Sequence, residues 1–162
     1  MPKIVILNST PIIALSSIDR LDLLEKLYGT VIIPTAVKDE IGAKSGSKAQ
    51  AQLATFDTWI QTKSIENVAQ KQTFKTQLHD GEVEVMILGQ ELNADLLIID
   101  DYMAREYAKY LGFKVIGTVG VILAAKSRAL IPEVKPYVDL LIMNDIYIGK
   151  RLYAEIMKIA DE

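Results

Sequence analysis

The chain contains no cysteine and only one histidine, His79, among its 162 residues. The absence of cysteine excludes a disulfide-stapled scaffold and any zinc or iron–sulfur site with thiolate ligands. A single imidazole argues against a two-histidine metal site and against a Ser-His-Asp triad, because no nucleophile-elbow pattern surrounds Ser9. We expect His79 to lie on the surface beside a helix. The remaining candidates for chemistry are oxygen-bearing side chains.

Long apolar runs are also missing. No run of strictly apolar residues approaches the ~18 residues that a membrane-spanning helix requires. The run Ile4–Leu7 near the start is too short for the apolar region of a signal peptide. We therefore expect a soluble, cytoplasmic protein with no membrane contact. At roughly 100–200 residues per domain, residues 1–162 form a single domain with a sizeable core.

The formal net charge of −3 is small, but the charges are unevenly distributed. Residues 80–106 have a local net charge of −7, which leaves +4 on the rest of the chain. The segment 44–75 is rich in lysine: Lys44, Lys48, Lys63, Lys71 and Lys75. These lysines lie either on a solvated helical arm or along a groove for RNA phosphates. The acidic stretch is either a second solvated face or part of a metal site.

Four short apolar runs predict the strands of the fold: Ile4–Leu7, Val31–Ile33, Leu96–Ile99 and Val115–Ile116. The runs do not alternate polar with apolar residues, which is typical of parallel strands buried on both faces. Segments with helical spacing separate them: 11–17, 20–28, 34–42, 48–56, 80–93, 101–111 and 117–128. A C-terminal helical hairpin follows at about 132–160. The pattern predicts a three-layer α/β/α fold with a parallel sheet of about four or five strands.

Ligands of open parallel sheets bind beyond the carboxyl ends of the strands. Asn8-Ser9-Thr10 follows the first run, Asp100-Asp101 follows the third, and Gly117-Thr118 follows the fourth. Asp100 and Asp101 include a candidate N-cap for the next helix. Two adjacent acids at a strand end also suit Mg²⁺ or Mn²⁺, which prefer hard oxygen ligands.

Two helices add further acids to the same end of the sheet. Glu40 shares a helix face with Ala36 and Val37, which indicates either an inward-facing ligand or an ion-paired rim residue. Asp80, Glu82 and Glu84 occupy the first turn of the helix at 80–93, where Asp80 is the expected N-cap. One of Glu82 and Glu84 is then available to a shared site. The convergence of acids from three segments favours a divalent metal site.

Several stretches, in order over nearly the whole chain, resemble one known family. They are 4–15, 18–24, 31–34 with Val37 and Glu40, 78–84, 94–101 with Ala104-Arg105, 111–120, 130–132 and 152–153. On these residues the chain resembles PIN domains, and more closely a prokaryotic PIN-like family related to VapC-type toxins.

The resemblance implies a Mg²⁺- or Mn²⁺-dependent ribonuclease that directs a metal-activated water at an RNA phosphodiester. It assigns the catalytic metal cluster to Asn8, Glu40, Glu82 and Asp100, with Glu84 and Asp101 as alternates. Ser9, Thr10 and Arg105 become candidates for substrate contact, although pairing of Arg105 with Asp101 is the simpler expectation. Such toxins are neutralised by a small cognate antitoxin, and PIN domains commonly pair as homodimers.

Asn8 departs from the family pattern, which usually has aspartate there. An amide oxygen can ligate Mg²⁺, but it brings no charge and cannot act as a base. Two functions therefore remain open: a weakened ribonuclease, or a catalytically impaired PIN-like module that binds RNA or a protein without cleaving it.

Two further sets of apolar residues remain to be assigned to the core, its rim or an interface. We expect Trp59 in the core, and Tyr102, Tyr107 and Tyr110 in core and rim packing. The last thirty residues carry more apolar surface than a helical hairpin hides alone. They complete the core, mediate dimerisation, or accept the antitoxin.

Overall fold

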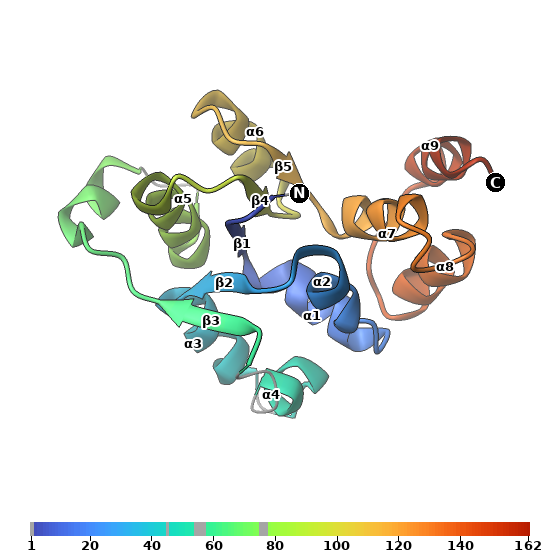
Figure 1. The fold of residues 1–162 in the computed structure, drawn as a ribbon, viewed down its shortest axis with the longest axis horizontal. Helices are drawn as coiled ribbons and strands as arrows, with labels where there is room; N and C mark the ends of the chain where they lie inside the picture. Colours follow the sequence, from blue (N-terminus) through green and yellow to red (C-terminus); the bar gives the residue numbers. More distant parts are fainter. Residues whose placement is uncertain (1, 45, 54–57, 75–77) are drawn as a thin grey trace.

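The computed structural model describes residues 2–44, 46–53, 58–74 and 78–162 (Figure 1). In these ranges five parallel strands form one sheet in the order β3-β2-β1-β4-β5. The strands are β1 (Val5–Leu7), β2 (Val31–Pro34), β3 (Ile60–Lys63), β4 (Leu96–Ile98) and β5 (Val115–Ile116). The predicted sheet is confirmed, with all four apolar runs present as strands.

Helices flank the sheet on both faces (Figure 1). On one side α3 packs against α5, which contacts β1 and β2; on the other, α2 packs against α7. The helices are α1 (Ser9–Ser17), α2 (Asp22–Tyr28), α3 (Thr35–Ala43), α4 (Lys48–Leu53), α5 (Asp80–Leu92), α6 (Tyr102–Tyr110), α7 (Thr118–Ser127), α8 (Lys135–Met143) and α9 (Lys150–Ala160), with a short 3₁₀ helix η1 (Val68–Thr73). The three-layer arrangement predicted from the sequence is thus confirmed.

The core explains why the strands carry unbroken apolar runs. Every residue of β1 is fully buried, because β1 is the central strand and both of its faces are covered. Helix α5 is buried continuously from Gly81 to Gly89, as its apolar residues on all sides indicate. Its first turn therefore places acidic residues at the edge of the apolar core.

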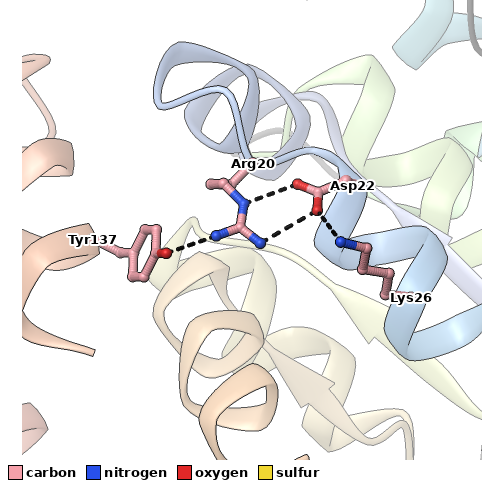
Figure 2. Close-up of polar contacts among 4 residues, drawn as sticks. All are labelled: Arg20, Asp22, Lys26 and Tyr137. Atoms are coloured by element: carbon pink, nitrogen blue, oxygen red, sulfur yellow. Dashed lines mark hydrogen bonds and ion pairs between the residues drawn. The ribbon is translucent and has the colours of Figure 1, made fainter. Parts of the chain in front are cut away.

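The C-terminal pair α8 and α9 lies beyond α7, on the side of the sheet away from α3 and α5 (Figure 1). An arginine joins this pair to the rest of the fold: Arg20 Nη1 donates a 2.7 Å hydrogen bond to Tyr137 Oη (Figure 2). The guanidinium carbon also lies 5.1 Å from the centre of the tyrosine ring. Asp22 holds Arg20 in place through Nε at 3.0 Å, and Lys26 pairs with Asp22 at 2.9 Å. This network anchors α8 to the junction between α1 and α2.

Glu162 makes a second anchor for the C-terminal pair. Its carboxylate accepts hydrogen bonds from the backbone amides of Val134 and Lys135 at 2.7 and 2.9 Å, and from Lys126 Nζ at 2.8 Å. The lysine, followed by the two amides, lowers the pKa of the Glu162 carboxyl to about 2. The carboxylate thereby ties the end of α9 to α7 and to the start of α8.

Three expectations from the sequence need correction. The lysine-rich segment is not a helical arm: in its described part, α4 is followed by the edge strand β3 and by η1. Lys75 lies outside the described residues. The N-cap of α5 is His79, which is exposed as expected, and Asp80 is its first residue. Tyr102 and Tyr110 are 71% and 84% exposed, so they do not pack in the core.

Other expectations hold. Trp59 is buried in the core. Within the described ranges, every helix is too short or too polar to traverse a lipid bilayer.

Candidate functional site

The carboxyl ends of β1, β4 and β5 meet at one edge of the sheet. Leu7 is paired with Ile98, and Ile98 with Ile116, so the residues that follow these strands start at one level. Asn8 continues this pairing, because its backbone N–H donates a 3.0 Å hydrogen bond to the Ile98 carbonyl. The topology therefore brings Asn8, Asp100 and Gly117 to the same edge, as the strand assignments predict.

Asn8 is buried, with 4% of its surface exposed, at the point where β1 leads into α1. It occupies the N-cap position, yet its side chain caps no amide of the helix. Its Oδ1 is fully buried and accepts no hydrogen bond from any described residue. Such unpaired buried acceptors are rare in folded proteins and cost about 1–3 kcal/mol each. The amide oxygen is thus a buried acceptor in need of a donor or a cation.

Glu40, on α3, contacts Ser9, the residue that follows Asn8. Ser9 Oγ donates a 2.8 Å hydrogen bond to Glu40 Oε2, which joins the start of α1 to α3. The other carboxylate oxygen lies against the first turn of α5. A Cβ built on Gly81 would lie 2.9 Å from Glu40 Cδ and closer still to Oε1. Glu40 can occupy this position only because residue 81 has no side chain.

Glu82 is the acid of the α5 first turn that faces this region. Its carboxylate accepts a 3.2 Å hydrogen bond from the backbone N–H of His79, which closes the capping box of α5. Burial raises the pKa of the Glu82 carboxyl, the His79 amide opposes that effect, and the charges of Asp101 and Glu40 raise the pKa further. Acids from α3, from α5 and from the end of β4 therefore act on one another electrostatically.

Thr118 holds Asp100, and the sequence reasoning did not assign this role. The Thr118 backbone N–H donates to Asp100 Oδ1 at 2.7 Å, and Thr118 Oγ1 donates to Oδ2 at 2.6 Å. Gly117 gives the carboxylate room, since a Cβ on it would lie 2.7 Å from Asp100 Oδ1. Asp101 instead caps α6 by accepting a 2.9 Å hydrogen bond from Ala104 N–H. The two adjacent acids thus have separate local roles.

Glu84 has partners of a different kind. Its Oε1 accepts a 3.1 Å hydrogen bond from the backbone N–H of Ala36, and its Oε2 forms a 2.6 Å ion pair with Lys71. The hydrogen bond to Glu84 is the main cause of the raised pKa of Lys71, which also pairs with Asp80. Both oxygens of Glu84 therefore bind protein groups that connect α5 with α3 and η1. Between the two acids left open by the sequence, Glu82 is the one electrostatically coupled to Glu40 and Asp101.

A cavity adjoins the edge of the sheet at Asp100. It has a volume of about 420 Å³, and Thr10, Asp100, Arg105 and Thr118 line its polar end. The expected pairing of Arg105 with Asp101 is not formed. In the described part of the chain the guanidinium has no hydrogen-bond or ion-pair partner, and its Nε is buried. Two of the three candidate substrate-contact residues, Thr10 and Arg105, therefore line one cavity with Asp100.

The donor set can be tested against a divalent metal ion. Among the described residues, no three histidine, aspartate or glutamate side chains are gathered closely enough to hold an ion on their own. The oxygen donors at this edge are of the hard type that Mg²⁺ and Mn²⁺ prefer. The buried and unpaired Oδ1 of Asn8 adds an acceptor that a cation would satisfy. In donor chemistry, the residues fit such an ion.

A family model described as a PIN domain matches residues 4–162. The chain belongs to the PIN-domain family. PIN domains are generally nucleases and generally use divalent metal ions. The oxygen-rich edge of the sheet is therefore the candidate active site of this PIN domain.

Nine chains of solved structures also match. One is a PilT N-terminus domain protein from the hyperthermophilic archaeon Sulfolobus solfataricus P2; it is 21% identical, with a TM-score of 0.56 over 75% of this chain and 92% of that one. Another is a domain of a functionally unknown protein from Methanocaldococcus jannaschii DSM 2661, with 18% identity and a TM-score of 0.49 over 71% and 90% of the two chains. None of the curated proteins matches this chain. The first likeness supports the PIN fold.

Proposed function

We propose that this PIN domain is a Mg²⁺- or Mn²⁺-dependent ribonuclease. One observation carries the proposal: the unpaired, buried Oδ1 of Asn8 lies at the sheet edge where Asp100 and Glu40 are held by other elements. A buried acceptor without a donor, beside carboxylates, is the environment that a hard cation stabilises.

Asn8, Glu40, Glu82 and Asp100 are the residues proposed to hold the ion. When bound, the ion would supply an activated water and stabilise the charge that develops on the phosphate. The chain's own residues prepare this site. Ser9 orients Glu40 through its hydrogen bond, and Thr118 fixes Asp100 with two.

Two side chains are proposed to receive the RNA. Arg105, with no partner in the described residues, would donate to a phosphate oxygen in the forked geometry that guanidinium groups provide. Thr10 is exposed and offers a hydroxyl at the mouth of the same cavity.

The test is titration of the purified protein with Mn²⁺, followed by calorimetry, with cleavage of a fluorescent RNA reporter measured in parallel. We expect saturable binding that Glu40→Gln and Asp100→Asn abolish. Asp39→Asn is the matched control, because Asp39 is an exposed acid on the same helix as Glu40. Asn8→Asp adds a charge at the site, so we expect tighter Mn²⁺ binding and faster cleavage.

The second candidate function is an impaired PIN module that binds RNA or a protein without cleavage. The neutral side chain of Asn8 favours it, because the family pattern has a carboxylate there. If the wild type binds no Mn²⁺ at millimolar concentration and Asn8→Asp restores binding and cleavage, the impaired module is the correct description.

The toxin role, the antitoxin and the homodimer belong to the same proposal. A toxin would arrest the growth of cells that express the wild type, and Asp100→Asn would relieve the arrest. Co-expression of a small antitoxin would also relieve it. Light scattering of the purified protein would give the mass of a dimer; a monomeric mass would remove the homodimer from the proposal.

A further inference from the structure

The 420 Å³ cavity beside Asp100 extends well beyond the carboxylates. It lies between β5, α7, α9 and the segment that connects α8 with α9. Its lining is mostly apolar and includes Ile116, Leu123, Ile146, Ile148 and Ile156. This volume falls within the range of about 300–1,000 Å³ that is typical of small-ligand pockets. The cavity is continuous with the candidate active site, because Asp100 and Thr10 line both.

The cavity is lined by charged side chains of both signs: Asp100, Arg105 and Glu155. Arg105 lines the cavity, and its guanidinium has no partner in the described residues. Lys150 and Arg151 follow in sequence between two lining residues, Ile148 and Leu152. Both are exposed, and neither forms an ion pair with any residue that the structure describes. One unpaired guanidinium in the lining, with two exposed cations on the neighbouring segment, offers donors to a phosphate group that an apolar peptide would leave unused.

Two further side chains suit a nucleobase. Tyr147 lines the cavity with a ring that is 92% exposed, so a base can stack on it without displacing protein. Glu155 also lines the cavity, and its carboxylate has no partner among the described residues. A free carboxylate only accepts hydrogen bonds, so it favours a base that presents an amino group.

We propose that this cavity binds one unstacked base of a single-stranded RNA that carries an amino group, and that Glu155 selects cytosine over uracil. The proposal rests on the proposed ribonuclease function and names its substrate class. The base lies among the apolar walls and against Tyr147, while its phosphate faces Arg105 and the active-site edge. Cytosine donates its amino group to Glu155, whereas uracil presents a carbonyl oxygen that the carboxylate repels.

The test compares binding of short oligo(C) and oligo(U) RNAs by fluorescence anisotropy at low salt, in EDTA so that no cleavage occurs. We expect the wild type to bind oligo(C) about tenfold more tightly than oligo(U), equivalent to ~1.4 kcal/mol. Glu155→Gln offers both a donor and an acceptor and should reduce this preference to less than about threefold. Glu133→Gln is the matched control, because Glu133 is an exposed acid outside the cavity.

Tyr147→Ala tests the stacking separately. We expect it to weaken binding of both oligonucleotides about tenfold, in keeping with the loss of one base–aromatic stack. Both side chains are exposed, so neither variant should unfold the protein, and circular dichroism would verify this.

Equal binding of the two oligonucleotides by the wild type would overturn the proposal. A preference for oligo(C) that persists in Glu155→Gln would overturn the role of Glu155. Failure to bind either RNA, together with binding of an apolar peptide, would assign the cavity to a protein partner. If cytosine preference holds but no RNA is cleaved with Mn²⁺, the ribonuclease proposal fails while the pocket stands. If RNA is cleaved with Mn²⁺ but the wild type binds both oligonucleotides equally, the ribonuclease proposal stands and the pocket proposal fails.

Discussion

Gly81→Ala offers the sharpest separation of active-site geometry from fold stability. The new Cβ would lie 2.9 Å from Glu40 Cδ and closer still to Oε1, so the carboxylate would have to turn away from the first turn of α5. This movement would break or lengthen the 2.8 Å hydrogen bond from Ser9 Oγ to Glu40 Oε2. One methyl group thereby displaces a proposed metal ligand without touching the ligand's own chemistry.

The expected magnitudes for stability and for metal binding differ. Replacing glycine by alanine in a helix stabilises it by up to about 1 kcal/mol. Loss of a hydrogen bond to a charged group costs about 1.5–3 kcal/mol. These effects largely offset each other, so the melting temperature should fall by only a few degrees. Residues that orient a metal ligand typically change metal affinity by about 10–100-fold when altered, and we expect a loss of Mn²⁺ affinity in that range.

The assay is Mn²⁺ calorimetry together with thermal unfolding in EDTA, for the wild type, Gly81→Ala and Gly42→Ala. Gly42 lies in α3 with no atom near a built Cβ, so its alanine variant should be slightly stabilised and bind Mn²⁺ normally. Mn²⁺ affinity in Gly81→Ala that equals the wild-type value, while Glu40→Gln loses binding, would refute the argument that Gly81 positions Glu40.

Three other predictions concern contacts that hold the fold around the site. Lys71→Met leaves Glu84 buried with no ion-pair partner, so unfolding in urea should show a loss of about 2 kcal/mol; adding Glu84→Gln should recover part of it, and no recovery would contradict the pairing. Tyr137→Phe removes the acceptor for Arg20 and should cost about 1 kcal/mol in the same assay; an unchanged midpoint would show that this hydrogen bond adds no stability to the ring contact. Glu162 has a pKa lowered to about 2, so its stabilisation is complete above the ordinary carboxyl pKa of 4.5 and disappears as the pH falls toward 2. The melting temperatures of the wild type and Glu162→Gln should therefore differ at pH 7 and converge by pH 2, and a pH-independent difference would count against this role.

The strands that the sequence predicts are those buried on both faces. Their apolar runs need no partner to be recognised, because continuous burial requires continuous apolar sequence. Strand β3 has no such signal: Gln61, Thr62 and Lys63 are all exposed at the edge of the sheet. Only its pairing with β2, in which Val31 lies beside Ile60, makes this segment a strand. A polar edge strand is therefore invisible to a hydrophobic pattern.

The candidate site likewise contains residues that could be placed from the sequence and residues that could not. Asn8 and Asp100 could be placed because they directly follow recognisable strands. The choice between Glu82 and Glu84 could not be made, since only one residue of helix separates them and both are buried. Lys71, which pairs with Glu84, comes from η1, a segment whose position no local pattern predicts. The role of Thr118 likewise depends on how closely β5 and β4 are aligned.

The acids that give residues 80–106 a net charge of −7 can be explained by their hydrogen-bond partners in the structure. Six of its eight acids accept hydrogen bonds from backbone amides: Glu82, Glu84, Glu91, Asp95, Asp100 and Asp101. Several of these bonds join segments far apart in the sequence, such as Glu91 with Glu66 and Asn67, and Asp95 with Lys3 and Ile4. Four of these six acids, Glu84, Glu91, Asp95 and Asp101, therefore satisfy backbone N–H groups and are not among the proposed metal ligands.

Only Glu82 and Asp100 remain from that stretch as proposed ligands, joined by Glu40 from α3 and by the neutral Asn8. Three carboxylates and one amide carry less negative charge than four carboxylates, so a divalent ion should bind this site more weakly than the usual PIN cluster. The same substitution reduces the mutual repulsion of the acids, which adds to burial in raising the pKa of Glu82. We therefore expect Asn8 to give weaker metal binding and a more stable metal-free fold than aspartate would give at this position. Asn8→Asp should show both effects at once: a lower melting temperature in EDTA and a larger rise on adding Mn²⁺.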